Sequence, residues 1–173
     1  MSVVRAAVAG LLVLLAVNLQ IGFFSHLTID GVVPDVVLLV VVGAALVRGP
    51  EYGAVLGFTA GLTLDLAPPA DHTVGRWALA LVITGYVAGL VRNDADRSAV
   101  VSVLTVAASA FTATSVFALS GLALGDPGVS TQLVIDVLPI AVLYDVALTP
   151  VVLPAVAWVM HRVAPMHHRW AYL

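Results

Sequence analysis

The sequence contains no cysteine and no lysine, and charged residues of every kind are scarce. Charged residues make up 10% of the 173 residues, and all seven basic side chains are arginines. Without cysteine, the chain has no disulfide framework, no thiolate nucleophile and no thiolate metal site. The net charge is -3, and the sequence has no run of basic residues that could bind along a phosphate backbone. We therefore expect no nucleic-acid partner.

What the sequence has in excess is apolar side chains. They account for 61% of the residues, and the mean hydropathy is +1.10, whereas a typical soluble domain is about one-quarter charged. No repeat, low-complexity tract or polar linker divides the chain. We therefore expect an all-α integral membrane protein in which residues 1–173 form a single transmembrane domain surrounded by lipid.

Six apolar segments predict six transmembrane helices, since one span takes about 20 residues. The first is longer than the core of a signal peptide and lacks a cleavage site, so we expect it to be retained. The second and third are short and form either two tilted helices or a re-entrant hairpin. Pro139, Pro150 and Pro154 should kink or break the sixth. The segments are Val3–Phe24, Val36–Val47, Tyr52–Leu66, Trp77–Val91, Ser98–Leu124 and Gln132 to about Val163.

The arginines predict how the helices are oriented, because cytoplasmic loops are enriched in basic residues. With the N-terminus in the cytoplasm, six of the seven arginines lie inside and only Arg76 lies outside. This orientation also places the C-terminus in the cytoplasm. Asp30 and Asp126 then lie in outer loops, and Asp35 lies at the outer end of the second span.

Glycines recur at every fourth position in the third span, as Gly53, Gly57 and Gly61, and again as Gly85 and Gly89 in the fourth. In lipid the hydrophobic effect does not drive helices together, and small residues at this spacing let two backbones approach closely. The pattern indicates a helix interface. It fits packing within this chain as well as packing against a partner chain.

Three aspartates stand out in or beside the apolar segments. Asp65 follows Gly61 by four residues, which suits either a solvated helix end or an inward polar contact. Asp136 and Asp145 lie in the sixth span, where an ionised aspartate costs about 2.5–3.5 kcal/mol at the helix centre. We expect both to be buried polar residues. They fit a proton or ion relay, a partner contact, or an acid satisfied internally beside a proline.

The residues that usually carry chemistry are scattered. The sequence has no glycine-rich phosphate loop, no arrangement of serine, histidine and aspartate typical of hydrolases, and no zinc-protease motif. We therefore predict no catalytic residues, no metal site and no cofactor, and we do not expect an enzyme. A small-solute site could draw on His72, Trp77, Asn18 and Gln20, but these residues form no convincing set.

Two stretches of the sequence resemble the MreD family of rod shape-determining membrane proteins. Pro34-Asp35 opens the second span, and the third contains the pattern G-F-x-x-G-L-x-x-D-L from Gly57 to Leu66. The matching positions are Pro34, Asp35, Gly57, Phe58, Gly61, Leu62 and Asp65. The resemblance implies that these residues shape the packing that presents a partner surface.

The resemblance also implies a function and a location. MreD-like proteins are non-catalytic, multi-pass subunits of the peptidoglycan elongation machinery in the bacterial cytoplasmic membrane. They work with MreC, and indirectly with MreB, a RodA-type glycosyltransferase and a penicillin-binding transpeptidase. Their six-helix arrangement is similar to the substrate-binding subunits of energy-coupling-factor transporters. The alternatives are therefore a solute-binding subunit of such a transporter, or a flippase-like carrier that uses Asp136 or Asp145.

Overall fold

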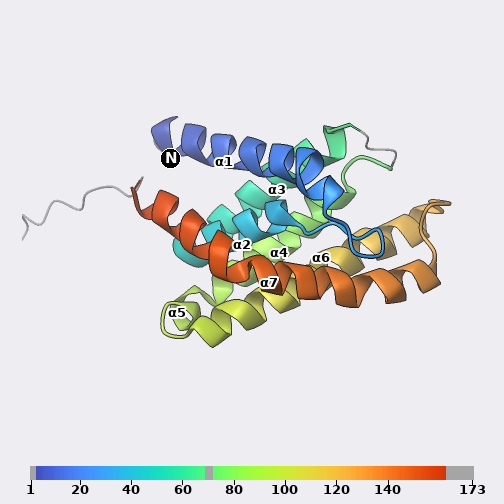
Figure 1. Cartoon of the computed structure of the whole chain (residues 1–173). Coiled ribbons are helices and arrows are strands. Elements are labelled where there is room, and N and C mark those ends of the chain that lie inside the picture. Colours follow the sequence, from blue (N-terminus) through green and yellow to red (C-terminus); the bar gives the residue numbers. More distant parts are fainter. Residues whose placement is uncertain (1–2, 69–71, 163–173) are drawn as a thin grey trace, which may run out of the picture.

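The computed structural model describes residues 3–68 and 72–162, and these residues form seven α-helices and no β-strand (Figure 1). The predicted all-helical fold is confirmed. Three stretches are long and apolar enough to cross a membrane, namely Val3–His26, Ala99–Leu124 and Thr131–Arg162. The helices are α1 (Val3–Gly22), α2 (Val36–Arg48), α3 (Pro50–Leu66), α4 (Arg76–Leu90), α5 (Arg92–Ala95), α6 (Ala99–Leu124) and α7 (Thr131–Arg162), with a short 3-10 turn, η1 (Phe24–His26), after α1.

Helix α2 forms the centre of the molecule. Every residue from Val36 to Leu46 is buried, and α2 contacts α1, α3, α4, α6 and α7. Its sequence is apolar on all sides, which is the pattern of a helix enclosed by other helices. At 1.5 Å per residue its 13 residues extend about 20 Å. That length is shorter than a membrane core of about 30 Å.

The link between α2 and α3 is a single residue. Gly49 has φ +95°, a left-handed conformation that favours glycine, and its amide donates to the Ala45 carbonyl at 2.7 Å. Pro50 begins α3, where a missing amide hydrogen costs nothing. The reversal therefore places α3 directly beside α2.

Helix α7 runs from Thr131 to Arg162 without interruption although it contains three prolines. Of the predicted kink or break, the break does not occur, because neighbouring helices and hydroxyl side chains can compensate for the lost backbone hydrogen bonds. Thr149, next to Pro150, donates from Oγ1 to the Asp145 carbonyl at 2.8 Å.

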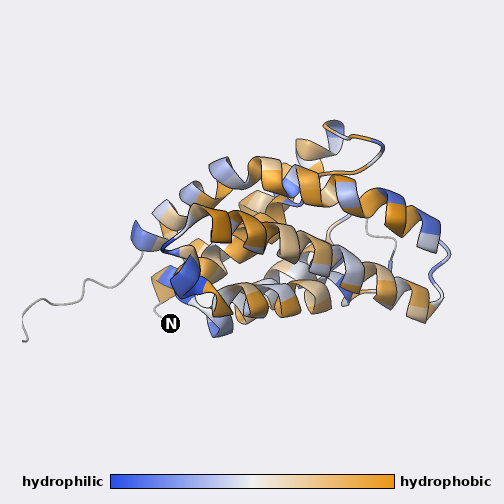
Figure 2. Cartoon of the chain, turned by 90° about the horizontal axis from the view of Figure 1, so that it is seen from below, coloured by the Kyte–Doolittle hydropathy of each residue, from blue (hydrophilic) through white to orange (hydrophobic). Residues whose placement is uncertain are grey.

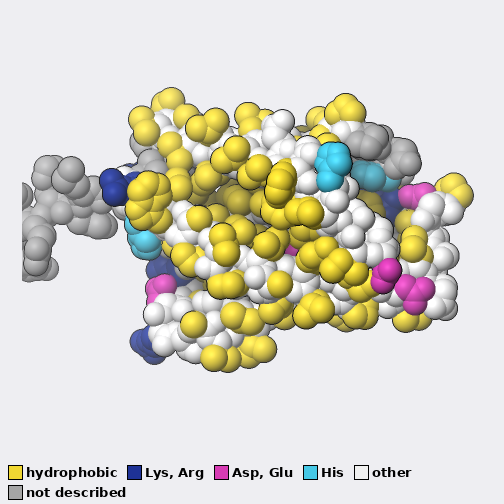
Figure 3. Space-filling view, viewed as in Figure 1, with side chains coloured by type: hydrophobic (Ala, Val, Ile, Leu, Met, Phe, Trp, Pro, Cys, Tyr) yellow, Lys and Arg dark blue, Asp and Glu magenta, His cyan; other side chains and the backbone are white. Residues whose placement is uncertain are grey.

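The outer surface is apolar along the helices and polar at their ends (Figures 2 and 3). Large hydrophobic side chains are exposed along α1, α6 and α7, as expected for helices that face lipid. Arginine side chains gather at the end where α1 begins and α7 ends (Figures 1 and 3). Arg76, at the start of α4, lies away from that end.

The absence of native cysteine allows a direct test of the predicted orientation. Asn93→Cys lies at the arginine-rich end, in α5, and Thr28→Cys lies in the loop that follows η1; both positions are exposed. We expect a membrane-impermeant maleimide to label Thr28→Cys on intact spheroplasts and Asn93→Cys only after permeabilisation. The reverse pattern would show that the arginine-rich end lies outside the cytoplasm.

Candidate functional site

The glycine face of α3 lies against α4. A Cβ added at Gly53 would lie 2.7 Å from the Gly85 carbonyl carbon, and one added at Gly57 would lie 2.6 Å from the Leu81 carbonyl carbon. One added at Gly61 would lie 2.5 Å from the Ala78 Cα. These distances leave no room for any side chain, so the two backbones are in direct contact over two turns.

The glycines of α4 complete the same interface. A Cβ at Gly85 would meet the Gly53 backbone and, at 2.9 Å, a Val41 methyl group of α2. A Cβ at Gly89 would lie 2.5 Å from the Gly49 carbonyl carbon at the α2–α3 link. The glycine pattern therefore serves packing between helices of this chain.

Asp65 lies at the end of this interface and binds the N-terminus of α4. Its carboxylate accepts hydrogen bonds from the amides of Gly75 at 2.8 Å and of Trp77 and Ala78 at 3.1 Å. Its exposed fraction is 2%, and His72 Nδ1 lies 3.7 Å from Oδ1. Of the two possibilities for Asp65, the structure shows the inward contact. The carboxylate satisfies amides that have no partner within α4 and carries the charge that a helix N-terminus favours.

The N-terminus of α2 is held by side chains from two other helices. Asp145 of α7 accepts from the Asp35 amide at 2.8 Å, and Gln20 of α1 accepts from the Val37 amide at 2.9 Å. Asp35 itself accepts from the Leu38 amide at 2.8 Å, as an N-cap residue does. Pro34 is buried just before it. The structure thus brings Asp35 and Asp145, which lie 110 residues apart, into direct contact.

A basic side chain of α2 binds the C-terminal end of α7. Arg48, in the last turn of α2, donates from Nη2 to the Met160 carbonyl at 2.6 Å. Met160 lies in the last turn of α7, where carbonyl groups lack partners and a positive charge is favoured. Helices α2 and α7 are therefore joined at both ends of α2, by Asp145 at one end and by Arg48 at the other.

Arg76 is a buried cation, whereas its sequence context predicts only that it lies on the outer side. It is 3% exposed, donates from Nε and Nη2 to the Phe117 carbonyl at 3.3 and 2.8 Å, and pairs with the Asp126 carboxylate. Its guanidinium lies 3.9 Å from the Phe117 ring centroid, and Gly121 leaves the space it occupies. The available signal was that Arg76 is the one arginine predicted to lie outside the cytoplasm.

The loop between α6 and α7 supplies Asp126, the acidic partner of Arg76. Asp126 accepts from the Gly128 amide at 2.9 Å. That bond lowers the pKa of Asp126 below its usual value; partial burial opposes this, and Arg76 adds to the lowering. Because the carboxylate stays ionised, it remains a partner for Arg76.

Asp136 is exposed, so the expectation that it is buried is wrong. It lies in the second turn of α7, where Gln132 Nε2 donates to its carboxylate at 3.1 Å. Phe58 also points outward, with 52% of its surface exposed, and Leu62 is partly exposed.

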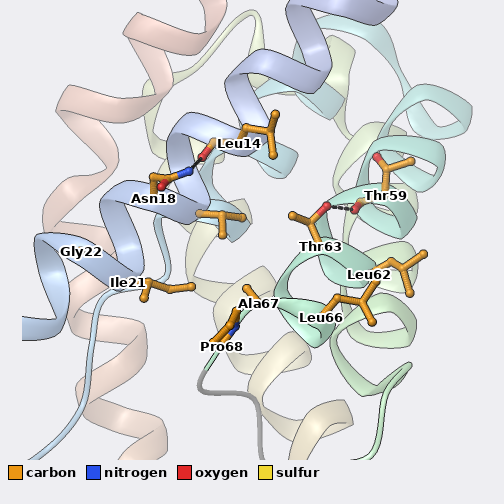
Figure 4. A pocket seen from close by; sticks show the side chains of 11 residues that line it. Leu14, Asn18, Ile21, Gly22, Thr59, Leu62, Thr63, Leu66, Ala67 and Pro68 are labelled. Atoms are coloured by element: carbon orange, nitrogen blue, oxygen red, sulfur yellow. Dashed lines mark hydrogen bonds between the residues drawn. The ribbon is translucent and has the colours of Figure 1, made fainter.

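An open groove of about 650 Å³ lies between α1 and α3 (Figure 4). Asn18 lies on the α1 side, and Thr59, Leu62 and Thr63 lie on the α3 side. His72 lines a different cavity, beside Arg76 and Phe117, and Gln20 is engaged with Val37. The polar residues considered for a solute site therefore do not converge.

These features define the chain as a helical membrane protein whose glycines and buried charges connect one helix to another. More specifically, the chain belongs to the family of the rod shape-determining protein MreD, whose family model matches residues 1–160. The resemblance noted in the sequence is thereby confirmed, and membership implies a role in determining rod shape. Comparisons with curated proteins and with solved structures found no match.

We expect Gly57→Ala to destabilise the protein by about 1–3 kcal/mol, because the new Cβ overlaps the Leu81 backbone, which cannot move independently of α4. Thermal unfolding in detergent, followed by tryptophan fluorescence, measures the change. Gly10→Ala in α1 is the matched control, since nothing lies within 4 Å of its Cβ position. Equal melting temperatures for the two variants would contradict close contact between α3 and α4.

We expect Asp65→Ala to destabilise the protein by about 2 kcal/mol or more, because it leaves the amides at the start of α4 without their acceptor. Asp136→Ala removes an exposed carboxylate and should leave the melting temperature nearly unchanged. Hydrogen exchange at Trp77 and Ala78 should increase in the first variant only. Unchanged protection there would show that Asp65 does not cap α4.

Proposed function

We propose that this chain is a non-catalytic subunit of the bacterial peptidoglycan elongation machinery, acting as a scaffold or regulator through its transmembrane helices. In this proposal α1, α2, α3, α4, α6 and α7 are six spans of the cytoplasmic membrane, with both termini in the cytoplasm. Their arrangement would be similar to that of the substrate-binding subunits of energy-coupling-factor transporters. Membership of the MreD family supports the role in rod shape.

The observation that carries the proposal is how the buried polar side chains are used. Asp65, Asp145 and Arg48 each bind backbone groups at the end of another helix, and Arg76 binds the backbone of α6. These contacts hold the helices in one arrangement, as a subunit that presents a fixed surface requires. Such a use supports a structural role for these side chains.

The chemistry of the surface indicates how partners would be contacted. The described residues are helices joined by short loops, with apolar side chains exposed along α1, α6 and α7. Contact with an MreC-like protein would therefore be made mainly between helices inside the bilayer. MreB, the RodA-type glycosyltransferase and the transpeptidase would be reached through that partner.

Loss of rod shape in cells tests the proposal. We expect the double variant Gly57→Leu and Gly61→Leu, expressed as the only copy of the gene, to give rounded cells and to lose the MreC-like protein on purification in mild detergent. The reason is that leucine cannot fit between α3 and α4. Gly10→Leu, at an open position on α1, serves as the control. Retention of both shape and partner in the double variant would contradict the proposal.

Asp145→Asn separates a scaffold from a proton-coupled carrier. An asparagine can still accept the hydrogen bond from the Asp35 amide, so a scaffold should keep rod shape and its partner. A carrier that needs the carboxyl group would lose function while the complex still assembled. Rounded cells that contain an intact complex would therefore favour the carrier.

A further inference from the structure

Asp35 and Asp145 meet at the N-terminus of α2, inside the helical bundle. Asp145 accepts from the Asp35 amide through Oδ1 at 2.8 Å, and Asp35 accepts from the Leu38 amide through its own Oδ1 at 2.8 Å. Asp145 is 2% exposed, and it lies 14 residues after Thr131, which is about 21 Å along α7. Two carboxyl groups from different parts of the chain are therefore enclosed at one place in the bundle.

No positively charged side chain is paired with these two acids. In the described part of the chain, neither Asp35 nor Asp145 takes part in a salt bridge. Arg48 lies in the last turn of α2, at the end opposite Asp35, and binds α7 there. The buried charges of α3 and α4, Asp65 and Arg76, are bonded to other groups. Helix α6, which packs against α2 and α7, contains no charged residue.

The remaining polar groups near the pair do not supply a positive charge either. Gln20 of α1 is uncharged and accepts from an α2 amide, and the Tyr144 hydroxyl of α7 donates to the Leu27 carbonyl at 3.0 Å. His26 and Asp30, in the segment between α1 and α2, can titrate, but both are exposed. The two acids must therefore be balanced by the backbone of α2 or by a proton.

The amides at the start of α2 can balance only part of two negative charges. A helix N-terminus carries about half of one positive elementary charge, whereas each ionised aspartate adds a full negative charge. A carboxylate inside the bundle loses its hydration, and a second carboxylate beside it adds repulsion. One bound proton removes the repulsion and leaves a single negative charge for the α2 amides to stabilise.

We propose that Asp35 and Asp145 hold one proton between them in the folded protein, and that this proton makes the junction of α2 and α7 sensitive to pH. Asp145 Oδ2 is free to carry the proton, since the hydrogen bond from the Asp35 amide is made to Oδ1. Loss of the proton would place two like charges at the junction and weaken the contact between the two helices. This role is structural and requires no transfer of the proton across the membrane.

The pH dependence of stability tests this proposal on the whole chain in detergent. A free aspartate ionises above about pH 4, so at neutral pH the folded state binds one proton more than the unfolded state, and its stability falls as the pH rises. Between about pH 5 and about pH 8, the folding equilibrium constant of the wild type should fall by up to about tenfold per pH unit, which is the slope for one proton. Unfolding followed by tryptophan fluorescence measures it.

Two asparagine variants identify the groups responsible for that slope. Asp145→Asn keeps a neutral acceptor for the Asp35 amide, so it should fold and lose the slope. Asp35→Asn should also lose it and should still cap α2, since asparagine is a good N-cap residue. Asp136→Asn, at an exposed position of the same helix α7, is the matched control and should keep the slope of the wild type.

Infrared spectroscopy detects the proton itself, because a protonated carboxyl group absorbs separately from carboxylates. At neutral pH the wild type and Asp136→Asn should show a protonated-carboxyl band that Asp145→Asn lacks. A wild-type pH slope equal to that of both Asp35→Asn and Asp145→Asn would overturn the proposal. A wild-type spectrum that matches the spectrum of Asp145→Asn in this region would also overturn it, since both acids would then be ionised.

Discussion

The structure depends on one constraint: backbone amides and carbonyls at a helix end must find partners where water is absent. An unsatisfied group costs several kcal/mol in lipid. Helix α2 is short and enclosed, so its first amides cannot reach water. Asp145 and Gln20 supply acceptors from α7 and α1, and Asp35 supplies one locally. Each acceptor from another helix also fixes the position of that helix, so the need to satisfy α2 positions its neighbours.

The interface between α3 and α4 also satisfies free amides at a helix end, but there the contact between the two backbones comes first. Close contact at Gly53, Gly57 and Gly61 sets the separation and the register of the two backbones. With that register, the next residue on the stripe, Asp65, reaches the first amides of α4. The stripe and the carboxylate therefore act as one unit. A change at a glycine that moved α4 would also move the amides that Asp65 binds.

The molecule is held together by contacts from side chains of one helix to backbone groups of another. Its charges join helices at their ends, as Arg76 does between α4 and α6, and its exterior along the helices is apolar. Membership of the MreD family connects this construction to rod-shape determination.

Composition and spacing by themselves determined that the chain is helical and apolar, where the helices lie, and that glycines mark a close interface, because these depend on local hydropathy and on the helical period. The tertiary structure decided which groups meet. Asp136 and Asp145 look alike in one apolar segment, yet only Asp145 faces α2. Likewise the sequence was compatible with a solvated Asp65 and with an Arg76 that lies in an exposed loop. Helices that are apolar on all sides carry no pattern to fix their rotation, so packing alone selects the buried polar contacts.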